Sequence, residues 1–191
     1  MRRIGVFCGS SMGNGAHFGA AADAVAVALV AHDLELVYGG AHVGLMGRIA
    51  DEVLARGGRV IGVIPQSMVE AEVAHSGLSQ LHIVATMAER KQQMADLSDG
   101  FIALPGGMGT LEEITEMLTL TQLHYQDKPC GFINVAGYYD HLFAFLEHAV
   151  DAGFLHPAHH RMICVAQSAE ELLAQFRRFQ SPSVRKWPDH S

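Results

Sequence analysis

The residues best suited to chemistry lie in one short stretch, residues 105–113, with the sequence P-G-G-M-G-T-L-E-E. The stretch follows an apolar run at residues 100–104 and precedes a segment with helical periodicity. Its glycines leave the backbone uncrowded, so that N–H groups can approach a ligand closely. Thr110 stands where a helix N-cap belongs, and helix N-termini attract phosphate through free N–H groups and the helix dipole. The stretch therefore predicts a strand, a phosphate-binding turn and the start of a helix that carries Glu113.

Glu113 has two interpretations from the sequence alone. Thr110 and Glu113 have the spacing of a capping box, in which the glutamate only reaches back to the N–H of the N-cap residue. Helical spacing also places Glu113 at the edge of a buried stripe, while Glu112 and Glu116 point to the opposite side. The stripe consists of Ile114, Met117, Leu118 and Thr121. Glu113 is therefore the carboxylate expected near both the loop and the interior, and the capping role stays open.

Arg90 and Lys91 are the second set of candidates, in the segment T-M-A-E-R-K of residues 86–91. Thr86 and Glu89 have capping-box spacing, so a helix is expected to begin here. Cations near a helix start are unfavourable because of the helix dipole. The pair could be ordinary solvated cations, but a phosphate ligand explains their position better.

The elements that must position these residues alternate along the chain between strands and helices. We predict strands at residues 3–8, 34–38, 59–64, 81–85, 100–104, 130–134 and 161–165. Helices are predicted at residues 16–31, from about residue 47 to 57, at 86–98, after Thr110, at about 139–151 and at 168–179. Residues 66–80 predict an irregular loop or a short helix.

Most of these strands are continuous apolar runs, which is typical of a parallel sheet covered on both faces. We predict an α/β fold: a single doubly wound, Rossmann-like domain over residues 1–179, with a mainly parallel sheet of about seven strands. Residues 180–191 form a C-terminal tail. Ligands of such sheets bind beyond the carboxyl ends of the strands. Glycine turns at residues 9–15, 39–47 and 106–109 all follow strands, so we expect the site at that edge.

Composition narrows the classes of function. The chain has 191 residues, 49% of them hydrophobic, and a formal charge of −7, which disfavours broad binding to nucleic acid or membrane surfaces. Its three cysteines, Cys8, Cys130 and Cys164, fall in apolar runs, as expected of free thiols in a reducing cytosol. No run is long enough to span a membrane and no signal peptide is visible, so we expect a cytoplasmic protein.

Several familiar kinds of site are disfavoured by missing motifs. The first glycine loop lacks the G-K-[ST] ending of a P-loop, and the G-x-S-x-G elbow of many hydrolases is absent. His156, His159 and His160 lie close together around a proline, without the context of a zinc motif, so we expect a solvated loop there. We expect no metal and no cofactor.

Taken in order, G-G-A-H-V-G-L-M-G, T-M-A-E-R-K, P-G-G-M-G-T-L-E-E and G-Y-Y-D-H-L resemble the LOG family over residues 4 to about 173. Members are cytokinin riboside 5′-monophosphate phosphoribohydrolases, long mislabelled as possible lysine decarboxylases. The resemblance implies hydrolysis of the N-glycosidic bond of a nucleoside 5′-monophosphate, giving free base and ribose 5-phosphate. It also implies a homodimer.

By the same resemblance, Arg90 and Glu113 are the catalytic pair. The residues implied to bind substrate are Glu72, Met87, Arg90, Lys91, Gly106, Gly107, Met108, Gly109, Thr110, Leu111, Glu112, Glu113 and Thr119. Thr119 lies two helical turns beyond Glu112, so we expect it to reach a ligand only through the loop or a dimer neighbour. Ala88 stands where the family often has histidine, which leaves the substrate preference open.

The chemistry suits a single carboxylate. Cleavage of a ribosyl bond passes through an oxocarbenium-like state, which an adjacent carboxylate stabilises and water then captures. Glu113 could stabilise this charge, activate water or act as the nucleophile, and Arg90 could orient Glu113 or bind phosphate. The competing class is a nucleotide or cofactor carrier with the same fold and no turnover.

Overall fold

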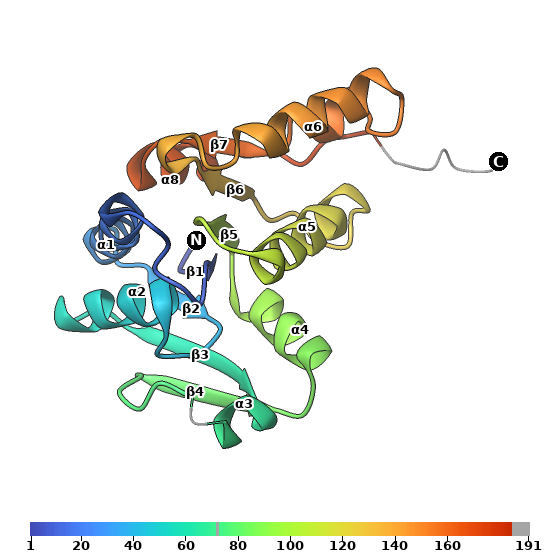
Figure 1. Cartoon of the computed structure of the whole chain (residues 1–191). Helices are drawn as coiled ribbons and strands as arrows, with labels where there is room; N and C mark the ends of the chain where they lie inside the picture. The colour runs from blue at the N-terminus through green and yellow to red at the C-terminus, as the bar shows by residue number, and fades with distance from the viewer. Residues whose placement is uncertain (72, 185–191) are drawn as a thin grey trace.

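Seven strands form one parallel sheet in the order β4-β3-β2-β1-β5-β6-β7 (Figure 1). The computed structural model describes residues 1–71 and 73–184. The strands are β1 (Arg3–Phe7), β2 (Glu35–Tyr38), β3 (Val60–Pro65), β4 (Gln80–Val84), β5 (Gly100–Ala103), β6 (Cys130–Ile133) and β7 (Cys164–Ala166). All neighbouring strands pair in parallel, which confirms the predicted doubly wound α/β fold.

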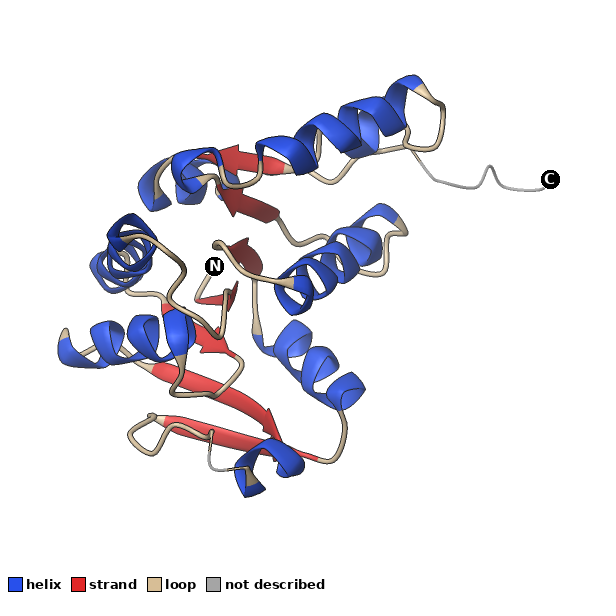
Figure 2. Cartoon of the chain, in the orientation of Figure 1, coloured by secondary structure: helices blue, strands red, loops and turns tan. Residues whose placement is uncertain are grey.

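Helices cover both faces of this sheet (Figure 2). They are α1 (Ala16–Ala31), α2 (Gly44–Ala55), α3 (Gln66–Glu70), α4 (Met87–Leu97), α5 (Met108–Gln122), α6 (Asp140–Asp151), α7 (Pro157–His160) and α8 (Ala169–Phe176), with a 3₁₀ turn η1 (Val135–Gly137). Helices α1, α2 and α8 pack on one face, and α4 and α5 pack on the other. None of the helices in the described residues is both long and apolar enough to cross a membrane.

Successive residues of each strand supply the two cores. Ile4 and Val6 of β1 face α1 and α2, whereas Phe7 joins the core beneath α4 and α5. In β2, Leu36 likewise lies on the first face and Val37 on the second, because side chains alternate along a strand. A strand buried on both faces must be apolar throughout, which explains the continuous hydrophobic runs in the sequence.

Two predicted capping boxes fix the starts of α4 and α8. The Thr86 hydroxyl accepts a hydrogen bond from the Glu89 N–H, and the Glu89 carboxylate accepts one from the Ala85 N–H. Ser168 and Glu171 make the corresponding pair of bonds at α8. Helix α4 therefore begins where its sequence predicts, and this places Arg90 in the second turn.

The predicted cap of α5 is wrong. The helix begins at Met108 with Gly107 as its N-cap, and Thr110 lies inside the first turn, only 3% exposed. An extended glycine can precede the helix without a side-chain cap, so Thr110 is free to pack over Gly106. The capping-box interpretation of Glu113 fails with it, because that side chain contacts Arg90 instead.

The C-terminal part also differs from the prediction. Strand β7 covers Cys164–Ala166 rather than residues 161–165. The expected solvated histidine loop contains the short helix α7, in which His159 is 2% exposed and pairs through Nε2 with the Val184 carbonyl at 2.9 Å. His156 caps this helix by accepting a hydrogen bond from the Ala158 N–H. Most of the predicted tail, residues 185–191, lies outside the described residues.

Candidate active site

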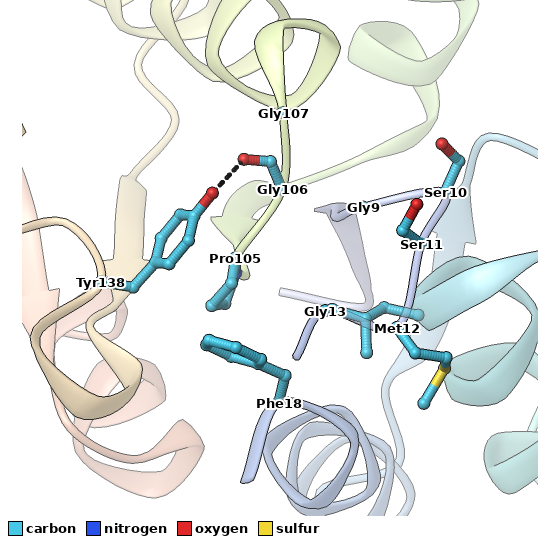
Figure 3. Close-up of a pocket in the computed structure, with 11 residues that line it drawn as sticks. Gly9, Ser10, Ser11, Met12, Gly13, Phe18, Pro105, Gly106, Gly107 and Tyr138 are labelled. Atoms are coloured by element: carbon cyan, nitrogen blue, oxygen red, sulfur yellow. Dashed lines mark hydrogen bonds between the residues drawn. The ribbon is translucent and has the colours of Figure 1, made fainter. Parts of the chain in front are cut away.

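The site lies where the chain leaves the sheet in opposite directions. Strands β1 and β5 are neighbours, but β1 leads to α1 on one face and β5 leads to α5 on the other. In open parallel sheets this switch point is where ligands bind. A cavity of about 300 Å³ opens there, between residues 9–13 after β1 and residues 105–107 after β5, with Phe18, Leu45 and Tyr138 completing its wall (Figure 3).

Backbone contacts hold the loops around this cavity together. The Gly9 N–H donates to the Pro105 carbonyl at 3.0 Å, and the Leu45 N–H donates to the Gly9 carbonyl at 3.1 Å. Gly44 has φ +59°, and a Cβ there would lie 2.2 Å from the carbonyl carbon of Ser10. The start of α2 therefore fits closely against the β1–α1 loop because glycine occupies position 44.

The start of α5 is open and has no side-chain cap. Gly107 is extended, Met108 is 83% exposed, and a Cβ added to Gly107 or Gly109 would meet nothing within 4 Å. The first N–H groups of a helix have no partner within the helix, and the dipole favours negative charge beside them. Gly106 is needed beneath this turn, since a Cβ there would lie 2.1 Å from Oγ1 of Thr110.

Arg90 reaches the site from α4 and is only 6% exposed. Its Nε–H donates to the Val63 carbonyl at the end of β3, at 3.1 Å. Its guanidinium lies over Gly39 at the end of β2, where a Cβ would be 2.0 Å from Nη2. Gly39, in the second glycine turn, is therefore the residue that leaves room for the cation.

Glu113 meets Arg90 from the second turn of α5. Oε1 of Glu113 lies 3.0 Å from Nη1 of Arg90, and the side chains are 10% and 7% exposed. Burial raises the pKa of the Glu113 carboxyl above its ordinary value, although the charge of Arg90 acts to lower it. The nearby Cys8 is also buried, and this burial, with a smaller effect of the Glu113 charge, raises the pKa of its thiol far above neutrality. Cys8 is thus held as a neutral thiol.

Lys91 of α4 forms ion pairs with carboxylates on the outer side of α5. Its ammonium group pairs with Glu112 and lies 3.0 Å from Glu116. The hydrogen bond from Lys91 to Glu112 is the main reason that the pKa of this lysine is raised. Glu112 and Glu116 are 56% and 40% exposed, as the helical phase predicts. The cation expected beside a phosphate therefore has two carboxylate partners within the chain.

Met87 and Thr119, which are also predicted to bind substrate, differ in how near they lie to the ion pair. Met87 is the first residue of α4, 47% exposed, with its sulfur 3.8 Å from Nη1 of Arg90. Thr119 is exposed and donates its hydroxyl to the Thr115 carbonyl of its own helix at 2.7 Å. It lies about 18 Å along α5 from Gly107, at about 1.5 Å per residue. Glu72 lies outside the described residues.

The cavity and the ion pair are adjacent but distinct regions. Arg90 and Glu113 are not among the residues that line the cavity, whereas Gly106 and Gly107 are. Glu113 follows Gly107 at about 9 Å along the helix axis. The ion pair, rather than the cavity, holds the buried ionisable side chains. The described residues contain no group of three or more His, Cys, Asp or Glu side chains arranged to hold a metal.

Sequence reasoning missed several residues of the cavity wall. Ser10, Ser11 and Met12 belong to a glycine turn that was identified as a strand-end loop but not assigned a role. Tyr138 lies in the motif G-Y-Y-D-H-L, which gives it no particular role, and Phe18 lies in no motif; both are brought to the cavity by tertiary packing.

The fold and the site together define a doubly wound α/β protein with a glycine-rich, uncapped helix start and a buried Arg–Glu pair near its switch point. Solved structures share the fold. The molybdenum cofactor binding protein of Rippkaea orientalis matches with a TM-score of 0.70 at 20% identity, covering 93% of this chain and 96% of that one. The molybdenum cofactor carrier protein of Chlamydomonas reinhardtii matches with a TM-score of 0.69 at 19% identity and the same coverage. At this identity the likeness shows the fold alone.

The chain belongs to the LOG family. The family model described as "possible lysine decarboxylase" matches residues 46–176. The cytokinin riboside 5′-monophosphate phosphoribohydrolase of Rhodococcoides fascians is 45% identical over 177 residues, which cover 92% of this chain and 89% of that protein. An Arabidopsis thaliana protein of the same name is 45% identical over 178 residues, covering 93% and 84%. A probable rice member is 48% identical over 177 residues, covering 93% and 79%.

Proposed function

We propose that this protein hydrolyses the N-glycosidic bond of nucleoside 5′-monophosphates, including cytokinin riboside 5′-monophosphates, and releases the free base and ribose 5-phosphate. The observation that carries the proposal is the buried pair of Arg90 and Glu113, 3.0 Å apart, beside the glycine-rich start of α5. Relatives named for this reaction are 43–48% identical over more than nine tenths of the chain.

The start of α5 would bind the 5′-phosphate. Uncapped N–H groups and the helix dipole favour an anion there, and glycines at 106, 107 and 109 let the phosphate come close to the backbone. Phosphate bound at this point fixes the ribose next to the helix that carries Glu113. Remote binding of this kind positions the bond to be broken.

Glu113 would act on the ribose. Breaking the bond between C1′ and the base nitrogen leaves positive charge on the sugar; the base departs with the electron pair and takes up a proton, while water supplies the hydroxyl at C1′. A carboxylate in a site that excludes most water stabilises that charge more strongly than one in solution. Stabilising the charge, activating water and attacking C1′ each require the ionised form of Glu113. Arg90 favours that form and orients it.

The competing function is that of a carrier which binds a nucleotide or cofactor without turnover. The molybdenum cofactor binding and carrier proteins that share this fold are only 19–20% identical to the chain, whereas the hydrolases are 43–48% identical. Cleavage of the ribosyl bond gives the buried Glu113 a role in stabilising the charge on the sugar, whereas a carrier without turnover has no such charge to stabilise. The enzymatic function is therefore favoured.

The test is chromatographic detection of free base. Purified protein is incubated with AMP and, separately, with isopentenyladenosine 5′-monophosphate, and the base released is measured over time. We expect turnover of at least one of these substrates and no release from the corresponding nucleosides, which lack the phosphate. Binding of both nucleotides without any base release would establish the carrier function instead.

We further propose that the protein forms a homodimer. The expectation comes from family likeness, and Thr119 gives it a structural reason: this exposed residue lies about 18 Å along α5 from the start of the helix, so it would contact substrate only across a subunit boundary. Light scattering coupled to size-exclusion chromatography measures the mass directly. A monomer at the concentrations that support full activity would disprove this arrangement.

The compartment we propose is the cytoplasm. All three cysteines are free, and Cys8 and Cys130 are buried as small apolar side chains rather than paired in a disulfide. Free thiols of this kind suit a reducing compartment. Cell fractionation followed by immunodetection would test the proposal, and recovery in an extracytoplasmic fraction would contradict it.

A further inference from the structure

Three consecutive carbonyl groups of the β5–α5 loop each accept a hydrogen bond from outside the loop, two from adjacent tyrosines and one from the β1–α1 loop. The Tyr139 hydroxyl donates to the Leu104 carbonyl at 2.7 Å, and the Gly9 N–H donates to the Pro105 carbonyl at 3.0 Å. The Tyr138 hydroxyl donates to the Gly106 carbonyl, also at 2.7 Å (Figure 3). The loop that leads into the anion-binding turn is thus held from outside at every carbonyl before the N-cap residue.

The two tyrosines are themselves fixed. The Asn134 side chain accepts a hydrogen bond from the Tyr139 N–H at 2.8 Å and donates one to Asp140 at 2.7 Å. Tyr138 packs edge-on against Phe18 and Tyr139, with ring centroids 5.8 and 4.9 Å apart. Tyr139 is 2% exposed, whereas Tyr138 is 45% exposed and lines the cavity. Tyr138 therefore contributes to the site and is not simply a core residue.

The bond from Tyr138 determines which way a neighbouring N–H points. No peptide bond in the described residues is cis, and in a trans peptide the carbonyl and the N–H point in opposite directions. With the Gly106 carbonyl directed at Tyr138, the Gly107 N–H is directed away from it. Figure 3 shows Ser10 and Ser11 on that opposite side. This N–H belongs to the N-cap residue of α5 and so to the proposed phosphate cradle.

Glycine makes such a hold necessary. The peptide between Gly106 and Gly107 is flanked by residues without Cβ atoms, whose backbone dihedrals are little restricted. If this peptide flipped, a carbonyl oxygen would replace the N–H that faces the anion. We propose that Tyr138 is a positioning residue that prevents this flip and thereby keeps the Gly107 N–H directed at the phosphate of the substrate. This inference rests on the proposed function, because it names the group that orients its phosphate site.

Tyr139 supplies a comparison within the same loop. Its hydroxyl holds the Leu104 carbonyl, and the next residue is Pro105, which has no N–H to be directed at a ligand. Loss of the Tyr139 bond therefore removes a structural contact without turning a donor away from the anion. Tyr125 serves as a surface control, since it is 78% exposed and follows the C-terminal end of α5, the end opposite the anion-binding turn.

The experiment compares Tyr138→Phe, Tyr139→Phe and Tyr125→Phe with the wild type. Binding of ribose 5-phosphate and of inorganic phosphate is measured by calorimetry, KM and kcat are measured with the nucleotide that is turned over, and Tm is measured by thermal unfolding. Tyr138→Phe keeps the ring and its aromatic contacts, so we expect a Tm close to that of the wild type. Both ligands should bind on the order of tenfold more weakly, as expected for losing one hydrogen bond to a charged group. KM should rise by a similar factor with a smaller change in kcat.

Tyr139→Phe should lower Tm and leave both affinities within about twofold of the wild type, and Tyr125→Phe should change neither quantity. Unchanged affinity in Tyr138→Phe would overturn the inference, as would equal weakening in Tyr139→Phe, because that would mean a general loosening of the loop. Failure of the proposed function has a different signature: wild-type protein that binds phosphate but releases no base. In that case the phosphate affinities of the variants still decide the role of Tyr138.

Discussion

Replacing Glu113 with glutamine removes one negative charge from the site and keeps almost the same side-chain shape. The carboxylate is 8% exposed and its Oε1 lies 3.0 Å from Arg90, so the substitution acts on a charge that water screens poorly. Because all three possible roles of Glu113 need the ionised form, the variant should bind nucleotide and turn it over slowly.

The size of the effect follows from the burial of this charge. Two opposite unit charges about 4 Å apart attract each other by about 4 kcal/mol at an effective dielectric constant of about 20. The sugar carries only part of a full positive charge in the transition state, so the loss should be about 3 kcal/mol. That corresponds to about a hundredfold decrease in kcat, since about 1.4 kcal/mol is a factor of ten. KM should change little, because the phosphate site is intact.

The pH dependence provides an independent measurement. Burial raises the pKa of Glu113, so activity should fall as the pH drops through a value above the ordinary one for a glutamate, about 4.3. This acidic limb of the kcat/KM profile should be absent from Glu113→Gln. Glu147→Gln, on the exposed surface of α6, is the matched control and should retain both the rate and the limb.

The third expectation concerns how the stability of the protein depends on pH, which follows from the raised pKa of Glu113 in the folded state. A carboxyl whose pKa is raised on folding stabilises the protein in its protonated form, and this contribution is lost as the pH rises through the folded-state pKa. At neutral pH the buried carboxylate therefore costs stability despite Arg90, and Glu113→Gln should unfold at a Tm no lower than that of the wild type. Near-wild-type kcat, or a large drop in Tm at pH 7, would refute the reasoning.

Two further substitutions test the surroundings of the Arg90–Glu113 pair, and a third tests the ion pair between Asp23 of α1 and Arg48 of α2, 2.6 Å apart. Arg90→Lys cannot both bond the Val63 carbonyl and pair with Glu113, so kcat/KM should fall by about tenfold or more while circular dichroism stays unchanged. Gly39→Ala places a methyl group 2.0 Å from Nη2 of Arg90 and should lower kcat by at least about tenfold; wild-type kinetics would mean that the guanidinium can move freely. Asp23, whose pKa is lowered mainly by its hydrogen bond with Arg48, stabilises the protein above its unfolded-state pKa, and this is lost as the pH falls through the folded-state value. Asp23→Asn should therefore lower Tm by about 1–3 °C at pH 7 and not at all in strong acid; a pH-independent difference would exclude this ion pair as its cause.

The fold could be predicted from the sequence because local and global signals agree. Apolar runs, most of them bounded by glycine or proline, marked all seven strands to within a few residues, and the capping boxes at Thr86 and Ser168 marked two helix starts. The bounds of the strand β7, at one edge of the sheet, were predicted less accurately. Strand β7 has only three residues and lies at an edge, where burial imposes a weaker pattern, so its position was displaced toward Arg161.

The site was predicted in part. Helical phase correctly placed Glu113 at the buried side of α5 and Glu112 on its exposed side. The N-cap was misplaced, because side-chain capping rules do not identify a helix that starts from an uncapped glycine such as Gly107. The motif G-Y-Y-D-H-L includes Tyr138 but does not indicate its role, because its contact with Gly106 spans 32 residues and depends on tertiary packing.

Two neighbouring cations on α4 face two neighbouring carboxylates on α5. Arg90 and Lys91 are consecutive on α4, and Glu112 and Glu113 are consecutive on α5, but the helices meet so that the inner residues pair with each other and so do the outer ones. In the outer pair Lys91 is 17% and Glu112 56% exposed, so water screens this pair more than the inner one. By holding Lys91, however, Glu112 and Glu116 keep a second cation at the surface, where it adds less than Arg90 to lowering the pKa of Glu113. Glu113 is therefore opposed mainly by Arg90, which favours the ionised carboxylate that the proposed reaction requires.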